Sequence, residues 1–232
     1  MRMLLTSNGI QNAVIQNAVV DLLGMPLSEA RIVVVIDAIL PFPGDKSKFV
    51  DHLTQIRSLG WAEFDVVSLF AGPASLVESR LRSADVVLGY GGSNHWLAHA
   101  WIATGLVPVL RAILDEKVYV GWSAGSMIFS RLHEASVVAF DDQDEVDLFE
   151  LGTGVPALPL LDWFLVPHLG ASYFPDHDDD WAARCAPRLG GPVWFLDDES
   201  ALLVRDAKRR PEIVSSGHWL RFDESGSLIE HA

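Results

Sequence analysis

The chain has 232 residues, half of them hydrophobic, and a formal net charge of -14 at pH 7. This length and composition suffice for one large core, so we expect residues 1–232 to form a single domain. The acidic balance argues against a nucleic-acid partner, because phosphate contacts need clustered Lys and Arg, and only residues 208–210 form such a run. No stretch approaches the roughly 20 apolar residues of a membrane span, and the N-terminus lacks a signal-peptide pattern. We therefore expect a cytoplasmic protein with no membrane partner.

The first half of the chain alternates predicted strands with predicted helices. The segment 31–36, RIVVVI, is apolar without alternation, which is typical of a parallel strand that is covered on both faces. Strands and helices joined by short Gly-containing turns indicate an α/β protein with a doubly wound, mostly parallel sheet, whose sites lie at the carboxyl ends of the strands. The predicted strands are 1–6, 31–36, 64–69 and 85–88, and the predicted helices are 10–23, 46–59, 75–81 and 107–114.

A glycine-rich turn follows the fourth predicted strand, in the sequence GYGGSN at 89–94. Gly91 and Gly92 precede Ser93 and Asn94, which are candidates for a helix N-cap. Such a turn exposes unpaired amide N–H groups that can hold an anion. We interpret it either as half of an oxyanion hole or as an ordinary glycine-rich turn.

The sequence contains no convincing metal site. His95 and His99 lie one helical turn apart, but Trp96 stands where a zinc-peptidase helix would carry Glu. We interpret both histidines as packing or exposed residues. Cys185 is the only cysteine, which excludes an intramolecular disulfide and favours a buried, unreactive side chain.

The most informative stretch is YVGWSAGSMIFS at 119–130. Three β-forming residues precede Gly121, and an apolar segment with helical character follows Ser123. In a G-x-S-x-G elbow the two glycines allow a tight strand-to-helix turn, which exposes the serine hydroxyl and aims the next amide N–H at the same point. We therefore predict Ser123 as a nucleophile.

The segment after the elbow is unusually acidic. FDDQDEVDLFE at 140–150 carries six acidic residues among eleven. It is either a solvated loop or a segment that overhangs the cleft, where it would repel acidic ligands and attract amines.

The C-terminal third contains the candidate bases and acids. A predicted strand at 163–166 ends at Pro167 and His168, and a strand at 193–196 ends in three adjacent acids, 197–199. The acids at 176–180 precede an amphipathic segment and suit a helix N-terminus. Short antiparallel strands are predicted at 201–204, 212–215 and 218–222.

Catalysis by Ser123 requires a histidine to take its proton and an acid to orient that histidine. Two assignments fit the sequence. In the first, His168 is the base and Asp198 is the acid. In the second, Asp197 or Asp198 orients His218, which gives the chain order of α/β-hydrolases. Spacing alone leaves both assignments open.

The combination of GYGGSN, VGWSAGSM, VPH at 166–168 and LDDESALLV resembles the peptidase E family of serine peptidases, which includes aspartyl dipeptidase and is similar to cyanophycinase. The resemblance implies a three-layer fold of the class I glutamine amidotransferase type. It also implies that Ser123 is the nucleophile, His168 the base and Asp198 the acid, and that the amides of Gly92 and Ala124 form the oxyanion hole. Members of the family need no metal or organic cofactor.

Substrate preference is harder to predict from these residues. By the resemblance we expect a small peptide substrate, with N-terminal Asp as the candidate first residue. A homodimer is the candidate assembly. Recognition of aspartate calls for a cation near the cleft, for which Arg184 and Arg188 are the candidates, and Asn94 is a further candidate contact. The acidic segment favours neutral or basic residues instead. An esterase that uses His218 and a non-catalytic binding protein that keeps the elbow as structure are the alternative functions.

Overall fold

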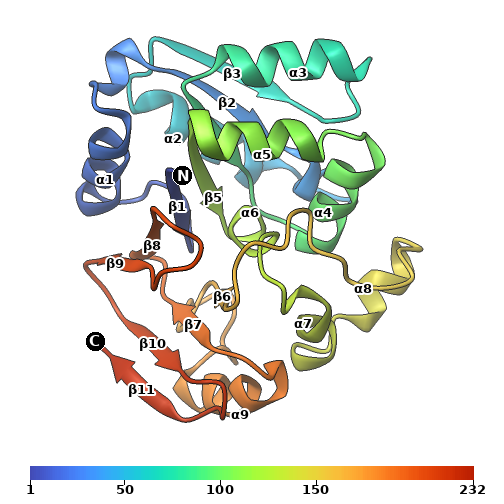
Figure 1. Ribbon diagram of the computed structural model, residues 1–232, viewed down its shortest axis with the longest axis vertical. Coiled ribbons are helices and arrows are strands. Elements are labelled where there is room, and N and C mark those ends of the chain that lie inside the picture. The colour runs from blue at the N-terminus through green and yellow to red at the C-terminus, as the bar shows by residue number, and fades with distance from the viewer.

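The computed structural model describes residues 1–232 and is drawn in Figure 1. Its strands are β1 (Met3–Thr6), β2 (Arg31–Val35), β3 (Glu63–Val67), β4 (Val86–Gly89), β5 (Val118–Trp122), β6 (Phe164–Val166), β7 (Val193–Leu196), β8 (Ser200–Val204), β9 (Glu212–Ser215), β10 (Trp219–Phe222) and β11 (Leu228–His231). Its helices are α1 (Ala13–Leu23), α2 (Ser47–Ser58), α3 (Ala74–Ser83), α4 (Asn94–Ala103), α5 (Val107–Glu116), α6 (Ala124–Met127), α7 (His133–Ala139), α8 (Gln143–Leu148) and α9 (Asp179–Leu189), with short 3-10 helices η1 (Leu27–Glu29) and η2 (Asp37–Ile39).

A seven-stranded sheet in the order β3-β2-β4-β5-β1-β8-β9 forms the centre of the molecule. Its first five strands are parallel, and β8 pairs antiparallel with both β1 and β9. Gly121 of β5 lies opposite Gly89 of β4 and Leu5 of β1. The carboxyl ends of these three central strands therefore lie side by side. The predicted α/β fold with a mostly parallel sheet is confirmed.

Alternate side chains of the central strands belong to two different cores. Val33 and Tyr119 pack with the buried side chains of α3, α4 and α5, whereas Val34 and Val120 pack with those of α1 and α2. Because each strand is buried on both faces, its sequence is apolar throughout rather than alternating. The helices on the two faces and the sheet between them make up the three layers.

The C-terminal strands divide between two sheets. β8 and β9 extend the central sheet, while β10 and β11 join β7 and β6 in a second sheet of order β11-β10-β7-β6. Only β6 and β7 are parallel in this second sheet. Helix α9 covers it at the bottom of Figure 1, where Ala182 and Leu189 pack with Val166 and Phe195. The antiparallel C-terminal extension is confirmed, and its division between two sheets was not predicted.

Local sequence signals set several helix ends. The Asn12 side chain accepts a hydrogen bond from the Ile15 amide and caps α1, and Gly24 ends that helix in the left-handed conformation, with φ of 71°. The Ser93 hydroxyl caps α4 in the same way through the Trp96 amide. No single helix is long and apolar enough to cross a membrane, although the bent pair α4 and α5 together meets both criteria.

The acidic segment 140–150 was predicted either as a solvated loop or as a segment that overhangs the cleft. It is not a loop but contains α8, which is anchored by Val146, a fully buried side chain. The preceding helix α7 was also missed, because both helices are short and their apolar residues give little periodicity. The two helices bring Asp142 and Glu145 to the edge of a cavity beside Ser123.

Candidate active site

Ser123 lies on the turn between β5 and α6. Its backbone φ is 50°, a value that residues other than glycine rarely adopt. The neighbouring glycines make this turn possible. A Cβ atom on Gly125 would lie 2.0 Å from the Gly89 carbonyl oxygen, and a Cβ atom on Gly121 would lie 2.5 Å from the Ser126 hydroxyl oxygen. The strained backbone at Ser123 is thus enforced by close packing, as in a nucleophile elbow.

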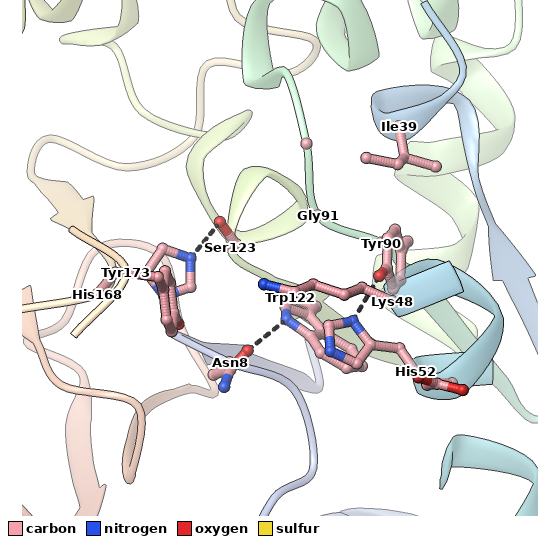
Figure 2. A pocket seen from close by; sticks show the side chains of 12 residues that line it. Asn8, Ile39, Lys48, His52, Tyr90, Gly91, Trp122, Ser123, His168 and Tyr173 are labelled. Carbon is pink, nitrogen blue, oxygen red and sulfur yellow. Dashed lines mark hydrogen bonds between the residues drawn. The ribbon is translucent and has the colours of Figure 1, made fainter. Parts of the chain in front are cut away.

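His168 and Asp198 complete a continuous chain of hydrogen bonds with Ser123. The Ser123 hydroxyl oxygen lies 2.9 Å from Nε2 of His168, and Nδ1 of His168 lies 2.7 Å from Oδ1 of Asp198 (Figure 2 shows the first contact). His168 follows β6 and Asp198 follows β7, so the second sheet supplies both partners of the serine. The structure therefore brings together the three residues of the first assignment.

The Asp198 carboxylate accepts further hydrogen bonds that sequence reasoning missed. Asn8 Nδ2 donates at 3.2 Å, Ser7 Oγ at 3.3 Å, and the Tyr173 hydroxyl donates to Oδ2. Burial of Asp198 raises its pKa, but the hydrogen bonds from His168 and Tyr173 outweigh this effect, so the net pKa is lowered. The carboxylate is thereby held in its charged form, which is the form that orients a catalytic histidine.

The second assignment finds no support in the structure. His218 contacts Asp179 and the C-terminal residue Ala232, and it lines neither cavity at Ser123. Asp197 accepts hydrogen bonds from the Ser200 hydroxyl and the His218 amide. Asp197 thus stabilises a turn, and Asp198 alone among the three acids of 197–199 contacts His168.

Two backbone amides next to Ser123, those of Gly92 and Ala124, are the predicted oxyanion-hole donors. Gly92 is exposed, has a φ of 133°, and its amide donates to no group of the protein. A side chain there would collide with the Ala38 carbonyl oxygen, 2.3 Å from the position of a Cβ atom. Ala124 opens α6, and the first amides of a helix have no intrahelical acceptor. The assignment of both residues to the oxyanion hole stays a prediction.

A cavity of about 410 Å³ adjoins Ser123, His168 and Gly92. Tyr90 and Trp122 form its apolar wall, with ring centroids 5.1 Å apart. In Figure 2 the Lys48 side chain extends across this cavity from α2, with its ammonium group on the side of Ser123. Sequence reasoning missed Lys48, because nothing in the sequence of α2 indicates which of its residues face the elbow.

The family model for peptidase family S51 matches residues 3–210. This chain belongs to peptidase family S51. The family implies a serine-type peptidase, and the predicted resemblance to peptidase E is confirmed. No curated protein matches the chain in sequence.

Two solved structures share the fold of this chain. A protein of Listeria monocytogenes EGD-e, described as a candidate peptidase E, superposes with a TM-score of 0.72 at 18% identity, over 93% of this chain and 98% of that chain. A peptidase from an acI-B1 Actinobacterium gives a TM-score of 0.68 at 15% identity, over 100% of this chain and 93% of that chain. At these identities the similarity concerns the fold.

A second cavity of about 320 Å³ adjoins Ser123 in this S51 peptidase. Asn94 lines it together with Asp142 and Glu145, and its contact with substrate stays a prediction. Burial raises the pKa of Glu145, an effect that the hydrogen bond from the Ser93 hydroxyl only partly offsets. The acidic segment thus overhangs the cleft, which was the second of its two predicted forms.

The two predicted arginines do not face the nucleophile. Arg188 pairs with Asp141 at 2.8 Å, Arg184 is exposed on α9, and neither lines either cavity. The expectation that one of them faces the scissile region is therefore not met. The amphipathic pattern of α9 fixed which of its residues are exposed, but not that this exposed face points away from the cleft.

No group of three or more His, Cys, Asp or Glu side chains could hold a metal ion. His95 is buried and its Nε2 lies 3.3 Å from Asp142, which agrees with the packing interpretation. Burial and the neighbouring His95 lower the pKa of His133 to about 3, so this buried histidine is neutral.

Proposed function

We propose that this protein is a serine exopeptidase that hydrolyses small peptides, dipeptides with N-terminal aspartate among them, through an acyl-enzyme on Ser123. The observation that carries the proposal is the unbroken hydrogen-bond chain from Ser123 through His168 to Asp198, next to two unpaired amides. A serine in this setting is poised for nucleophilic attack because its base and its oxyanion donors are both in place.

Each group has a defined role in the proposed reaction. His168 takes the Ser123 proton as Oγ attacks the scissile carbonyl carbon, and the Gly92 and Ala124 amides stabilise the resulting oxyanion. His168 then donates the proton to the leaving amine, which departs and leaves the acyl-enzyme. Water, deprotonated by His168, hydrolyses the ester and regenerates Ser123. Asp198 remains charged throughout and stabilises the imidazolium.

The first cavity is lined by one cation, Lys48, and one acid, Asp51, and Lys48 supports recognition of an acidic residue. Lys48 forms no ion pair or hydrogen bond within the protein and lines the cavity beside Ser123. A carboxylate that binds there would gain a charge-assisted hydrogen bond. Lys48, rather than Arg184 or Arg188, is therefore the proposed cation that binds the substrate carboxylate. Both cavities fall within or near the range of about 300–1,000 Å³ that is typical of small-ligand pockets, which favours short peptides.

The proposal is tested by hydrolysis of matched dipeptides. We expect Asp-Leu to be cleaved with a kcat/KM about tenfold above that of Asn-Leu, since the two differ by one charge. Lys48→Met should remove this difference, whereas Arg184→Ala should keep it. Ser123→Ala should lower turnover of every substrate by about 10³-fold or more.

Three results would contradict the proposal. Retained hydrolysis in a clean Ser123→Ala preparation would exclude Ser123 as the nucleophile. A preference for Asp-Leu that survives Lys48→Met would place aspartate recognition elsewhere. Complete inertness of the wild type toward peptides and serine-directed reagents would favour the non-catalytic binding protein instead.

A further inference from the structure

The second cavity shares only Gly92, Ser123 and His168 with the first. It is the more acidic of the two, because the first is lined by one cation, Lys48, and one acid, Asp51. Asp142 and Glu145 line the second cavity, and no Lys or Arg does. Each acid uses one carboxylate oxygen within the protein: Oδ2 of Asp142 contacts His95, and Oε1 of Glu145 accepts from Ser93. The other oxygen of each carboxylate has no hydrogen-bond partner. The cavity therefore offers two partly desolvated acceptors for a positive charge.

Asn94 adds a third acceptor from the helix that begins beside the oxyanion turn. Its side chain is almost fully buried, with 6% exposed, and lines the cavity. Nδ2 of Asn94 lies 3.1 Å from Nε2 of His133. Because the low pKa of His133 keeps the ring neutral, Nε2 can accept this hydrogen bond and hold the amide in one orientation. Oδ1 of Asn94 then remains without a partner.

Aromatic rings form much of the remaining wall, with Met127, Val166 and Pro167 beside them. His177 stacks between Phe174 and Trp181, with ring centroids 4.7 Å and 4.0 Å away. Phe140 lies against Trp181 at 5.8 Å. Burial lowers the pKa of His177, so this ring adds no positive charge. Aromatic faces attract cations and also cover the alkyl stems of Lys and Arg side chains.

We propose that this cavity binds the cationic side chain of a lysine or arginine residue on the leaving-group side of the scissile amide. The inference rests on the proposed peptidase function and extends it. Lys48 favours an aspartyl side chain in the first cavity, which leaves the second cavity for the residue that follows the scissile bond. The preferred substrates are thus dipeptides that carry an acidic and then a basic residue, such as Asp-Lys and Asp-Arg.

The test measures binding without turnover, in the Ser123→Ala background. Asp-Lys and Asp-norleucine have side chains of similar length and differ in the terminal ammonium group. We expect Asp-Lys to bind about tenfold more tightly by calorimetry, as for a charge-assisted contact. Glu145→Gln should remove most of this difference, and Asp142→Asn should reduce it. Asp144→Asn is the matched control, because Asp144 is an exposed acid on the same helix that does not line the cavity and should leave the difference unchanged.

The outcomes separate this inference from the proposed function. Equal binding of Asp-Lys and Asp-norleucine would overturn the cavity assignment, while fluorophosphonate labelling of wild-type Ser123 would leave the peptidase function standing. A preference that persists in both the Glu145→Gln and Asp142→Asn variants would also overturn it. If Ser123 is inert but the preference for Asp-Lys is present and depends on Glu145, the peptidase function fails and the cation site stands.

Discussion

The Asp198 carboxylate accepts more side-chain hydrogen bonds than any other group of the proposed triad. It faces His168 while three other residues, Ser7, Asn8 and Tyr173, also hydrogen-bond its carboxylate. These partners come from the turn after β1 and from the loop after β6, so the acid is held by segments far apart in the sequence. The net lowering of its pKa means that the folded protein favours the charged carboxylate.

We therefore predict that Asp198→Asn lowers kcat by about 10³- to 10⁴-fold, because an amide would stabilise the wrong tautomer of His168. The measurement is steady-state hydrolysis of the best dipeptide. Glu199→Gln is the matched control: its carboxylate contacts Asn12 and Ser216 rather than His168, so activity should be kept. Comparable losses in both variants would contradict the assignment of Asp198 as the orienting acid.

At the scale of elements, the elbow depends on the close approach of α6 to β4. The Gly125 position admits no Cβ atom, because the Gly89 carbonyl oxygen would lie 2.0 Å away. We predict that Gly125→Ala lowers the free energy of unfolding by about 3 kcal/mol, the upper end of the usual range for overpacking. Urea unfolding measures this change.

Gly72→Ala provides the control for Gly125→Ala. A Cβ atom at Gly72 would have only the Leu76 side chain near it, at 3.6 Å, which is an ordinary van der Waals distance. The substitution should therefore change stability by less than about 0.5 kcal/mol. A Gly125→Ala protein as stable as Gly72→Ala would show that β4 and α6 are not packed as the structure describes.

Helix α7 carries a second testable feature, the buried neutral His133. Its folded-state pKa of about 3 lies below the reference value of 6.5, so between these values the unfolded chain binds more protons. Stability should then fall as the pH drops below 6.5, with this residue contributing up to about 1.4 kcal/mol per pH unit. In His133→Phe that part of the slope should vanish. Equal slopes for the two proteins in urea unfolding between pH 6.5 and 4.5 would contradict a neutral, buried His133.

For the whole molecule, the parts that follow local rules were predictable from the sequence. Uniformly apolar β2 indicated a strand covered on both faces, and the spacing of Gly121 and Gly125 around Ser123 indicated the elbow. The base and the acid needed a resemblance to a known family, because His168 and Asp198 meet only when β6 and β7 pair in a second sheet. Lys48 could not be predicted, since its position depends on how α2 packs against the central sheet.

The positions of the charged residues around the site also could not be predicted from the sequence alone. Two predicted arginines proved to lie away from the cleft, and Lys48 lines the first cavity in their place. The acids of 140–150 proved to divide between solvent and the second cavity. Which charges meet the substrate depends on tertiary packing, so the net charge of -14 says little about the polarity of either cavity.

The central claim is that Ser123 is a nucleophile activated by His168. The most direct measurement is the rate of covalent labelling by a fluorophosphonate, followed by intact mass and peptide mapping, in the wild type, His168→Ala and His218→Ala. We predict one label per chain at Ser123 in the wild type. The labelling rate should fall by about 10³-fold or more in His168→Ala and stay nearly unchanged in His218→Ala. A wild type that takes up no label, or a label whose rate depends on His218 and not on His168, would contradict the account.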